Sequence, residues 1–173
     1  NLFEPGDNPK DNAQFLLFLV AVIKAIDEYQ DLMRISSASA GNDHRLGSNE
    51  APPAVISVFL GDELTEILEA ISEGKKAYGK SKESMELGTH VLPAIPKDTT
   101  DRNRTSPFAF TGNKFEFRMV GSSDSIADTN TAINTAVTQV LNEFYEILST
   151  APDFTTALNN LVRDTIKNHK RIL

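Results

Sequence analysis

Near its beginning this chain has a run of nine apolar residues, 15–23, which limits the folds it can adopt. Charged residues follow from Lys24 onward. A membrane-spanning helix needs roughly 20 consecutive apolar residues, so this run is too short to cross a bilayer. It predicts instead a helix that is apolar on nearly every side and is buried on several faces. Asp11 or Asn12 is placed to cap its start.

The middle of the chain has weaker patterns. Small and polar residues with no regular period predict an exposed loop over 36–53. β-branched and aromatic residues then predict a buried strand at 55–60. Apolar residues at helical spacing over 62–71 predict a helix that ends at Gly74. The prolines in the short apolar stretch 91–96 disfavour a regular strand there.

The last third of the chain contains two strands and two helices by the same reasoning. Phenylalanines and a methionine alternate with other residues over 108–119, which predicts two strands joined by a tight turn at 111–113. Helices are expected over about 129–148 and, capped by Asp153, in the final segment. The whole pattern predicts an α+β fold, with mainly antiparallel strands flanked by helices.

The length of 173 residues suits a single domain. However, the long apolar helix needs partners on several faces, and the few predicted strands offer little surface to cover it. We therefore expect residues 1–173 to form one partial domain of a larger enzyme, with a helical insertion at about 61–97.

The charge balance limits the classes of partner. The formal net charge is −7, which argues against a nucleic-acid-binding protein because such proteins present a basic face to phosphates. The 173 residues contain no cysteine, so disulfides and thiolate metal sites are excluded within them. A reducing, cytoplasmic location is expected.

The polar loop holds the first candidate site. Arg45 and Glu50 lie on it just before the proline pair 52–53. An arginine and a carboxylate on one anchored loop can grip an anionic substrate and shield a reacting centre. An internal salt bridge on a surface loop is the ordinary alternative.

A second candidate is the charged segment 101–105. Arg102 and Arg104 are two positions apart, so in an extended segment both guanidinium groups point the same way. Such a double fork suits phosphate or carboxylate. A solvated run of charges would give the same pattern.

A third candidate lies on the predicted final strand. Lys114, Glu116 and Arg118 alternate with apolar residues, so strand geometry places them on the face opposite the core, roughly 7 Å apart. A carboxylate between two cations can bind Mg²⁺ while the cations hold phosphates. An ion-pair ladder on a solvated face is the alternative.

The histidines give no metal-binding pattern. His44 lies in the polar loop, whereas His90 and His169 are isolated and are expected to be surface or packing residues. The sequence also has no phosphate-binding loop and no glycine-rich dinucleotide fingerprint.

Taken in order, these clusters resemble the C-terminal part of the catalytic domain of glutamine synthetase. Residues 42–53, Asn-Asp-His-Arg-Leu-Gly-Ser-Asn-Glu-Ala-Pro-Pro, resemble the Arg-Leu and Glu-Ala-Pro flap of that family. Residues 102–104 are similar to its Arg-Asn-Arg segment, and residues 115–118 to its hydrophobic-Glu-hydrophobic-Arg strand. The stretch 38–122 is most similar to the large bacterial type III branch.

The resemblance implies an ATP-dependent ligase of nitrogen metabolism, which makes glutamine from glutamate and ammonia through a γ-glutamyl phosphate. It implies Mg²⁺ or Mn²⁺ as cofactor, ATP as a substrate, and a homo-oligomeric ring for the whole protein. A sister ligase that joins glutamate to another amine, and a non-catalytic interaction module on the same fold, are the alternatives.

The resemblance also implies roles for the flap residues. Glu50 would be catalytic, because it would help to deprotonate ammonium and would keep water from the acyl phosphate. It would also contribute to substrate binding with Arg45, which would hold the glutamate carboxylate. Arg104 would stabilise the charge on the transferring phosphoryl group.

On the final strand, the resemblance makes Glu116 a metal ligand and Arg118 a substrate-binding residue. Arg104, Lys114 and Arg102 would contact the nucleotide or its phosphates. The better-known branches carry a further arginine where this chain has Ala109, so that nucleotide contact is missing.

Other parts of the family's site have no counterpart in residues 1–35. These are the remaining metal-binding carboxylates and a glycine-rich, histidine-containing segment, both of which precede the flap. One carboxylate does not make a magnesium site, because Mg²⁺ takes about six ligands. We therefore predict that this chain alone has no ligase activity.

Overall fold

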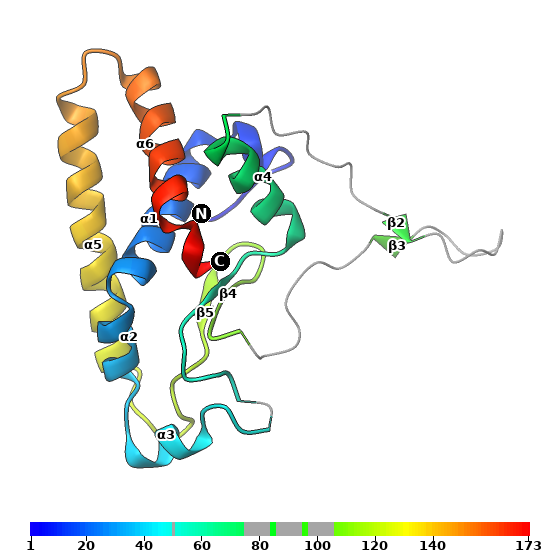
Figure 1. Ribbon diagram of the computed structural model, residues 1–173, viewed down its shortest axis with the longest axis vertical. Coiled ribbons are helices and arrows are strands. Elements are labelled where there is room, and N and C mark those ends of the chain that lie inside the picture. Colours follow the sequence, from blue (N-terminus) through cyan, green and yellow to red (C-terminus); the bar gives the residue numbers. More distant parts are fainter. Residues whose placement is uncertain (50, 75–83, 86–94, 97–105) are drawn as a thin grey trace.

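The structure is a computed structural model, and it describes residues 1–49, 51–74, 84–85, 95–96 and 106–173. Three long helices, α1 (Ala13–Glu28), α5 (Ala127–Ser149) and α6 (Phe154–His169), pack side by side (Figure 1). A small sheet lies beside this helical layer. The molecule is therefore helix-rich with a minor β component, which confirms the α+β class in outline.

Helix α1 is the centre of the core, as its sequence predicts. Asn12 caps it, because the side-chain oxygen accepts a hydrogen bond from the Phe15 backbone N–H at 3.0 Å. Packing against both α5 and α6 covers the helix on several faces. Its side chains from Leu19 to Ile23 are all buried. The described helices include none that is long and apolar enough to span a bilayer.

The other helices extend this layer. Helix α2 (Gln30–Ser36) follows α1 almost directly and packs on α5, while α4 (Asp62–Ser72) packs on α6 (Figure 1). Short 3₁₀ turns, η1 (Pro9–Asp11) and η2 (Lys170–Ile172), contact α1 from the two ends of the chain. The predicted helix over 62–71 is confirmed.

The two C-terminal helices form an antiparallel hairpin. Asp153 caps α6 by accepting a hydrogen bond from the Thr155 N–H at 3.1 Å, as predicted. Buried residues of α5 recur every four positions at Ala132, Ala136, Val140 and Phe144, which is one face of the helix. This face contributes to the common core.

The main sheet contains β1 (Val58–Phe59), β4 (Phe108–Phe110) and β5 (Phe115–Phe117), in the order β1-β4-β5. Strands β4 and β5 pair antiparallel, but β1 pairs parallel with β4. This sheet is therefore mixed, and the expectation of mainly antiparallel strands is not confirmed. The strand predicted at 55–60 is shorter than expected, because the pairing covers only two of its residues.

The predicted turn between the last two strands is confirmed. Thr111 N–H donates to the Lys114 carbonyl at 2.9 Å, and Gly112 has a φ of 97°, which favours glycine. Elsewhere, β2 (Ser84–Met85) and β3 (Ile95–Pro96) form a separate antiparallel pair. The prolines were expected to disfavour a regular strand over 91–96, and the pairing at 95–96 is only two residues long and ends at a proline.

The segment 36–53 is not simply a loop. It contains α3 (Ala40–Arg45), whose first turn is capped by Ser39 Oγ, an acceptor for the Asn42 N–H at 3.2 Å. The helix is too short to show an apolar period, which is why the sequence pattern indicated an irregular loop. Helix α3 lies where α2 ends, beside the chain that leads from β5 to α5 (Figure 1).

Candidate functional site

The exposed face of β5 and its flanks carries three charged side chains. Glu116 Oε2 accepts a hydrogen bond from Arg118 Nη2 at 3.2 Å, and Glu116 Oε1 lies 3.8 Å from Lys114 Nζ. The intervening Phe115 and Phe117 pack against the core. The alternation predicted from the sequence therefore holds: the charged and apolar side chains occupy opposite faces.

The three charged side chains differ in exposure. The side chain of Arg118 is 13% exposed, that of Glu116 39% and that of Lys114 66%. Thr111 Oγ1 also donates to Glu116, at 3.4 Å. The arrangement is an ion-pair ladder, and it leaves the carboxylate within reach of a ligand from solvent.

Arg45 lies at the end of α3 and reaches the chain just beyond this ladder. Its Nη2 donates to the carbonyls of Met119 at 2.9 Å and Val120 at 3.4 Å, and its Nε donates to Asn42 Oδ1 at 2.9 Å. These acceptors are neutral. Arg45 forms no ion pair within the part of the chain that the structure describes, so its positive charge is not cancelled there.

Asn42 connects the same two segments, and sequence reasoning gave it no role. Only 4% of the residue is exposed. Its Nδ2 donates to the carbonyls of Ser37 at 2.6 Å and Met119 at 2.7 Å. Asparagine is a weak helix former, so an asparagine inside a one-turn helix is the signal that could have indicated such side-chain bonds.

Further bonds hold α3 in place from its other sides. Arg34 Nη2 donates to Asp43 Oδ1 at 2.7 Å, which links α2 to α3. Ser39 Oγ donates to Asp124 Oδ2 at 3.3 Å, which links α3 to the chain before α5. A Cβ on Gly121 would lie 2.6 Å from that same carboxylate oxygen, so a side chain at this position would displace the Asp124 carboxylate. Arg45 thus stands on a well-anchored helix.

The family of this chain follows from its similarity to known proteins. No family model matches the chain. The chain is 47% identical over 176 residues to the type-3 glutamine synthetase of Dictyostelium discoideum, a match that includes 100% of this chain and 24% of that protein. It is 54% identical over 147 residues to the glutamine synthetase of Bacteroides fragilis (strain YCH46), covering 83% of this chain and 20% of the relative.

A third relative, the glutamine synthetase of Butyrivibrio fibrisolvens, is 60% identical over 118 residues, which is 67% of this chain and 16% of that protein. The chain belongs to the glutamine synthetase family. The resemblance found in the sequence motifs, including that to the type III branch, is confirmed. The chain spans about a fifth of the length of the curated relatives that it matches.

The structure brings together part of the site predicted from glutamine synthetase motifs. Arg45 meets the chain immediately after Arg118, which in turn pairs with Glu116. Three other predicted site residues, Glu50, Arg102 and Arg104, lie outside the described residues, as does His90. Of the predicted site, the structure therefore describes Arg45 of the flap and the charged ladder on β5.

Glu116 could be one ligand of a metal site in a glutamine synthetase. Its partly exposed carboxylate is the kind of oxygen donor that Mg²⁺ prefers. Among the residues that the structure describes, no three histidine, aspartate or glutamate side chains are grouped closely enough to hold a metal ion. One carboxylate fits one of about six ligand positions, so the other ligands would come from elsewhere.

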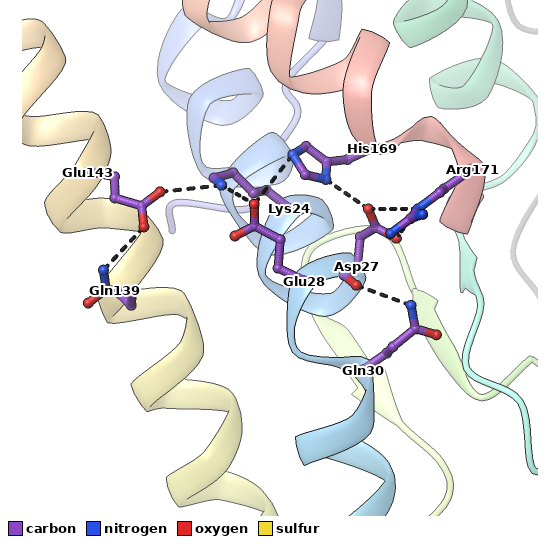
Figure 2. A network of polar contacts seen from close by, with 8 residues as sticks. All are labelled: Lys24, Asp27, Glu28, Gln30, Gln139, Glu143, His169 and Arg171. Carbon is purple, nitrogen blue, oxygen red and sulfur yellow. Dashed lines mark hydrogen bonds and ion pairs between the residues drawn. The ribbon is translucent and has the colours of Figure 1, made fainter.

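A second polar cluster lies between the helices (Figure 2). Asp27, whose side chain is 2% exposed, lies 2.8 Å from His169 Nδ1 and accepts a hydrogen bond from Arg171 Nε at 2.8 Å. Gln30 donates to the Asp27 carbonyl at 3.1 Å. His169 was expected to be isolated, but it pairs with Asp27 and, at 3.7 Å, with Glu28. The sequence analysis did not anticipate the buried carboxylate.

Lys24 extends this cluster toward α5 (Figure 2). It pairs with Glu28 and, at 3.3 Å, with Glu143, whose other oxygen accepts a hydrogen bond from Gln139 at 3.1 Å. Burial acts to lower the pKa of Lys24, but the hydrogen bonds to the two glutamates outweigh it and raise the pKa above its ordinary value. The cluster links the three long helices and has no described connection to the ladder.

Proposed function

We propose that this chain is the C-terminal part of the catalytic domain of a cytoplasmic glutamine synthetase, which ligates ammonia to glutamate with ATP through a γ-glutamyl phosphate. The observation that carries the proposal is the placement of Arg45. A charged guanidinium of the flap segment is hydrogen-bonded to the end of the strand that bears Glu116 and Arg118. Family membership over the whole chain supports the same reaction.

Arg45 is proposed to hold a carboxylate of glutamate. Two of its nitrogens are occupied by amide and carbonyl oxygens, while Nη1 makes no hydrogen bond with any residue that the structure describes. Neutral acceptors fix the orientation of the guanidinium without removing its charge. A charge held in this way suits recognition of a carboxylate, because arginine binds such groups through directed hydrogen bonds.

The ladder is proposed to serve the metal and the phosphates. Glu116 would supply one oxygen to Mg²⁺ or Mn²⁺, and Arg118 both orients that carboxylate and would contact substrate. Lys114 is highly exposed and would reach nucleotide phosphates. The metal, when bound, would neutralise charge on the transferring phosphoryl group.

The remaining roles follow from the motifs alone and are part of the proposal. Glu50 would help to deprotonate ammonium and would shield the acyl phosphate, and Arg104 would stabilise the transferring phosphoryl group. Arg102 would contact the nucleotide. We further propose residues 1–173 as one partial domain with an insertion at about 61–97, and a homo-oligomeric ring for the whole enzyme.

The test compares the full-length protein with the isolated chain. Glutamine formation from glutamate, ammonia and ATP is measured for both with Mg²⁺ and with Mn²⁺. The full-length protein is expected to be active and the 173-residue chain inactive, because the chain carries one of the required metal ligands. No glutamine from the full-length protein would contradict the reaction, and glutamine from the isolated chain would contradict the partial-domain proposal.

A further inference from the structure

Asn42 is one of the few buried polar residues among those described, and the proposed chemistry does not use it. Its carboxamide is fully engaged by three backbone or side-chain groups. The nitrogen donates to the Ser37 and Met119 carbonyls, and the oxygen accepts from Arg45 Nε. Since a carboxamide has two N–H groups and one oxygen, each part of the group has a partner.

These partners fix which way the amide points. Rotating the carboxamide by 180° would set its oxygen against two carbonyl oxygens and its N–H groups against the Nε–H of Arg45. Both changes would be repulsive, so the orientation follows from the hydrogen bonds alone. An aspartate of the same shape would have no N–H to donate at either carbonyl.

The Met119 carbonyl connects Asn42 and Arg45, because both side chains donate hydrogen bonds to it. The carbonyl oxygen accepts from Asn42 Nδ2 at 2.7 Å and from Arg45 Nη2 at 2.9 Å. The Arg45 guanidinium is therefore held at two nitrogens: Nε by the Asn42 side-chain oxygen, and Nη2 by the Met119 carbonyl. Asn42 Nδ2 also binds that carbonyl. Asn42 and the carbonyl together set the plane of the guanidinium relative to the end of β5.

We propose that Asn42 is a positioning residue for Arg45. It holds the guanidinium against the Met119 carbonyl, so that the remaining N–H groups stay aimed at the substrate carboxylate. Asn42 acts through Arg45 and does not itself touch substrate. This inference rests on the proposed function, in which Arg45 binds glutamate.

The experiment uses the full-length enzyme and the variants Asn42→Asp and Arg45→Ala, alone and combined. Asn42→Asp removes both N–H donors and places a negative charge beside the guanidinium. We expect the KM for glutamate to rise about tenfold, because the new carboxylate would pair with the guanidinium and the amide bond to the Met119 carbonyl would be lost, with little change in the KM for ATP. In the Arg45→Ala background, the same substitution is expected to change the KM for glutamate less than about twofold, because its target is absent.

Thr129→Val is the matched control for the loss of a buried hydrogen bond. Thr129 is also buried, and its hydroxyl donates to the Ser36 carbonyl at 3.1 Å, but it does not contact Arg45. This variant is expected to lower the thermal unfolding midpoint and to leave the KM for glutamate unchanged. Asn42→Ser provides a second, uncharged test if Asn42→Asp does not fold, and the same selective rise in KM is expected for it.

Three outcomes would overturn the inference while the proposed function stands. These are an unchanged KM for glutamate in the Asn42 variants of an active enzyme, an equal effect of Asn42→Asp with and without Arg45, and an equal rise in KM in Thr129→Val. If the wild-type full-length protein formed no glutamine, the proposed function would fail and the inference with it.

Discussion

The Arg171 guanidinium lies 2.8 Å from the buried carboxylate of Asp27, 144 residues earlier in the chain. His169 contacts the same carboxylate at 2.8 Å. The final turn of the chain is thereby joined to the central helix α1. A buried charge is costly unless it is paired, so the chemistry of this pair bears directly on stability.

Replacing Asp27 by alanine is expected to destabilise the chain. The change removes the buried partner of His169 and Arg171 and opens a polar cavity beside α1, with a loss of about 3 kcal/mol in the free energy of unfolding. Urea unfolding followed by circular dichroism measures it. Asp164→Ala is the matched control, because Asp164 is exposed and pairs with its neighbour Arg163 on the surface. Equal effects of the two substitutions would contradict a special role for the buried carboxylate.

Replacing Lys24 by methionine is expected to lower stability in a pH-dependent way. The pKa of Lys24 is raised in the folded chain, where hydrogen bonds to Glu28 and Glu143 outweigh burial. The stabilising contribution is therefore fully present below the unfolded value of 10.5 and is lost as the pH rises through the folded value.

The measurement for Lys24 is the thermal midpoint of wild type and variant between about pH 8.5 and about pH 12.5, roughly two units either side of the ordinary lysine value. The difference between them should be largest at the lower end and shrink at the upper end. A difference that does not vary with pH would show that Lys24 stabilises the fold through packing alone.

Replacing Asp153 by alanine is expected to weaken the start of α6. Hydrogen bonds from the Thr156 hydroxyl and from nearby backbone N–H groups lower the pKa of this exposed carboxyl. Its contribution is present above the unfolded value of 3.8 and disappears as the pH falls through the folded value. Thermal midpoints at neutral and acidic pH test this, and Asp153→Asn is the control because asparagine also caps helices.

Replacing Glu116 by alanine separates the two interpretations of the strand ladder. If the ladder is only a surface feature, stability changes by less than about 0.5 kcal/mol and activity is retained. If Glu116 is a metal ligand, as we propose, glutamine formation by the full-length enzyme is lost while its thermal midpoint hardly moves. Glu146→Ala, at an exposed position of α5, should leave both unchanged.

Local patterns were sufficient to predict much of the fold. The apolar run placed α1, the cap at Asp153 placed the start of α6, and Gly112 marked the hairpin turn. In each case the signal lies within a few residues of the element, so no long-range contact is needed to recognise it. The opposite faces of β5 followed from alternation for the same reason.

The parts that sequence reasoning missed depend on distant contacts. Helix α3 and its Asn42 are held by the Met119 carbonyl, 77 residues further along. Strand β1 is defined by its parallel pairing with β4, about 50 residues later, so its short length could not be read from its own residues. The burial of Asp27 could not be predicted for the same reason, because its partners His169 and Arg171 lie at the other end of the chain.

One backbone oxygen, that of Met119, fastens both the helix that carries Arg45 and the strand that carries Glu116. A shift of either element would strain the hydrogen bonds that Asn42 and Arg45 donate to this oxygen. A ligand that restricts the motion of α3 or of β5 should therefore restrict the motion of both. The fluctuations of the two elements should be correlated in solution.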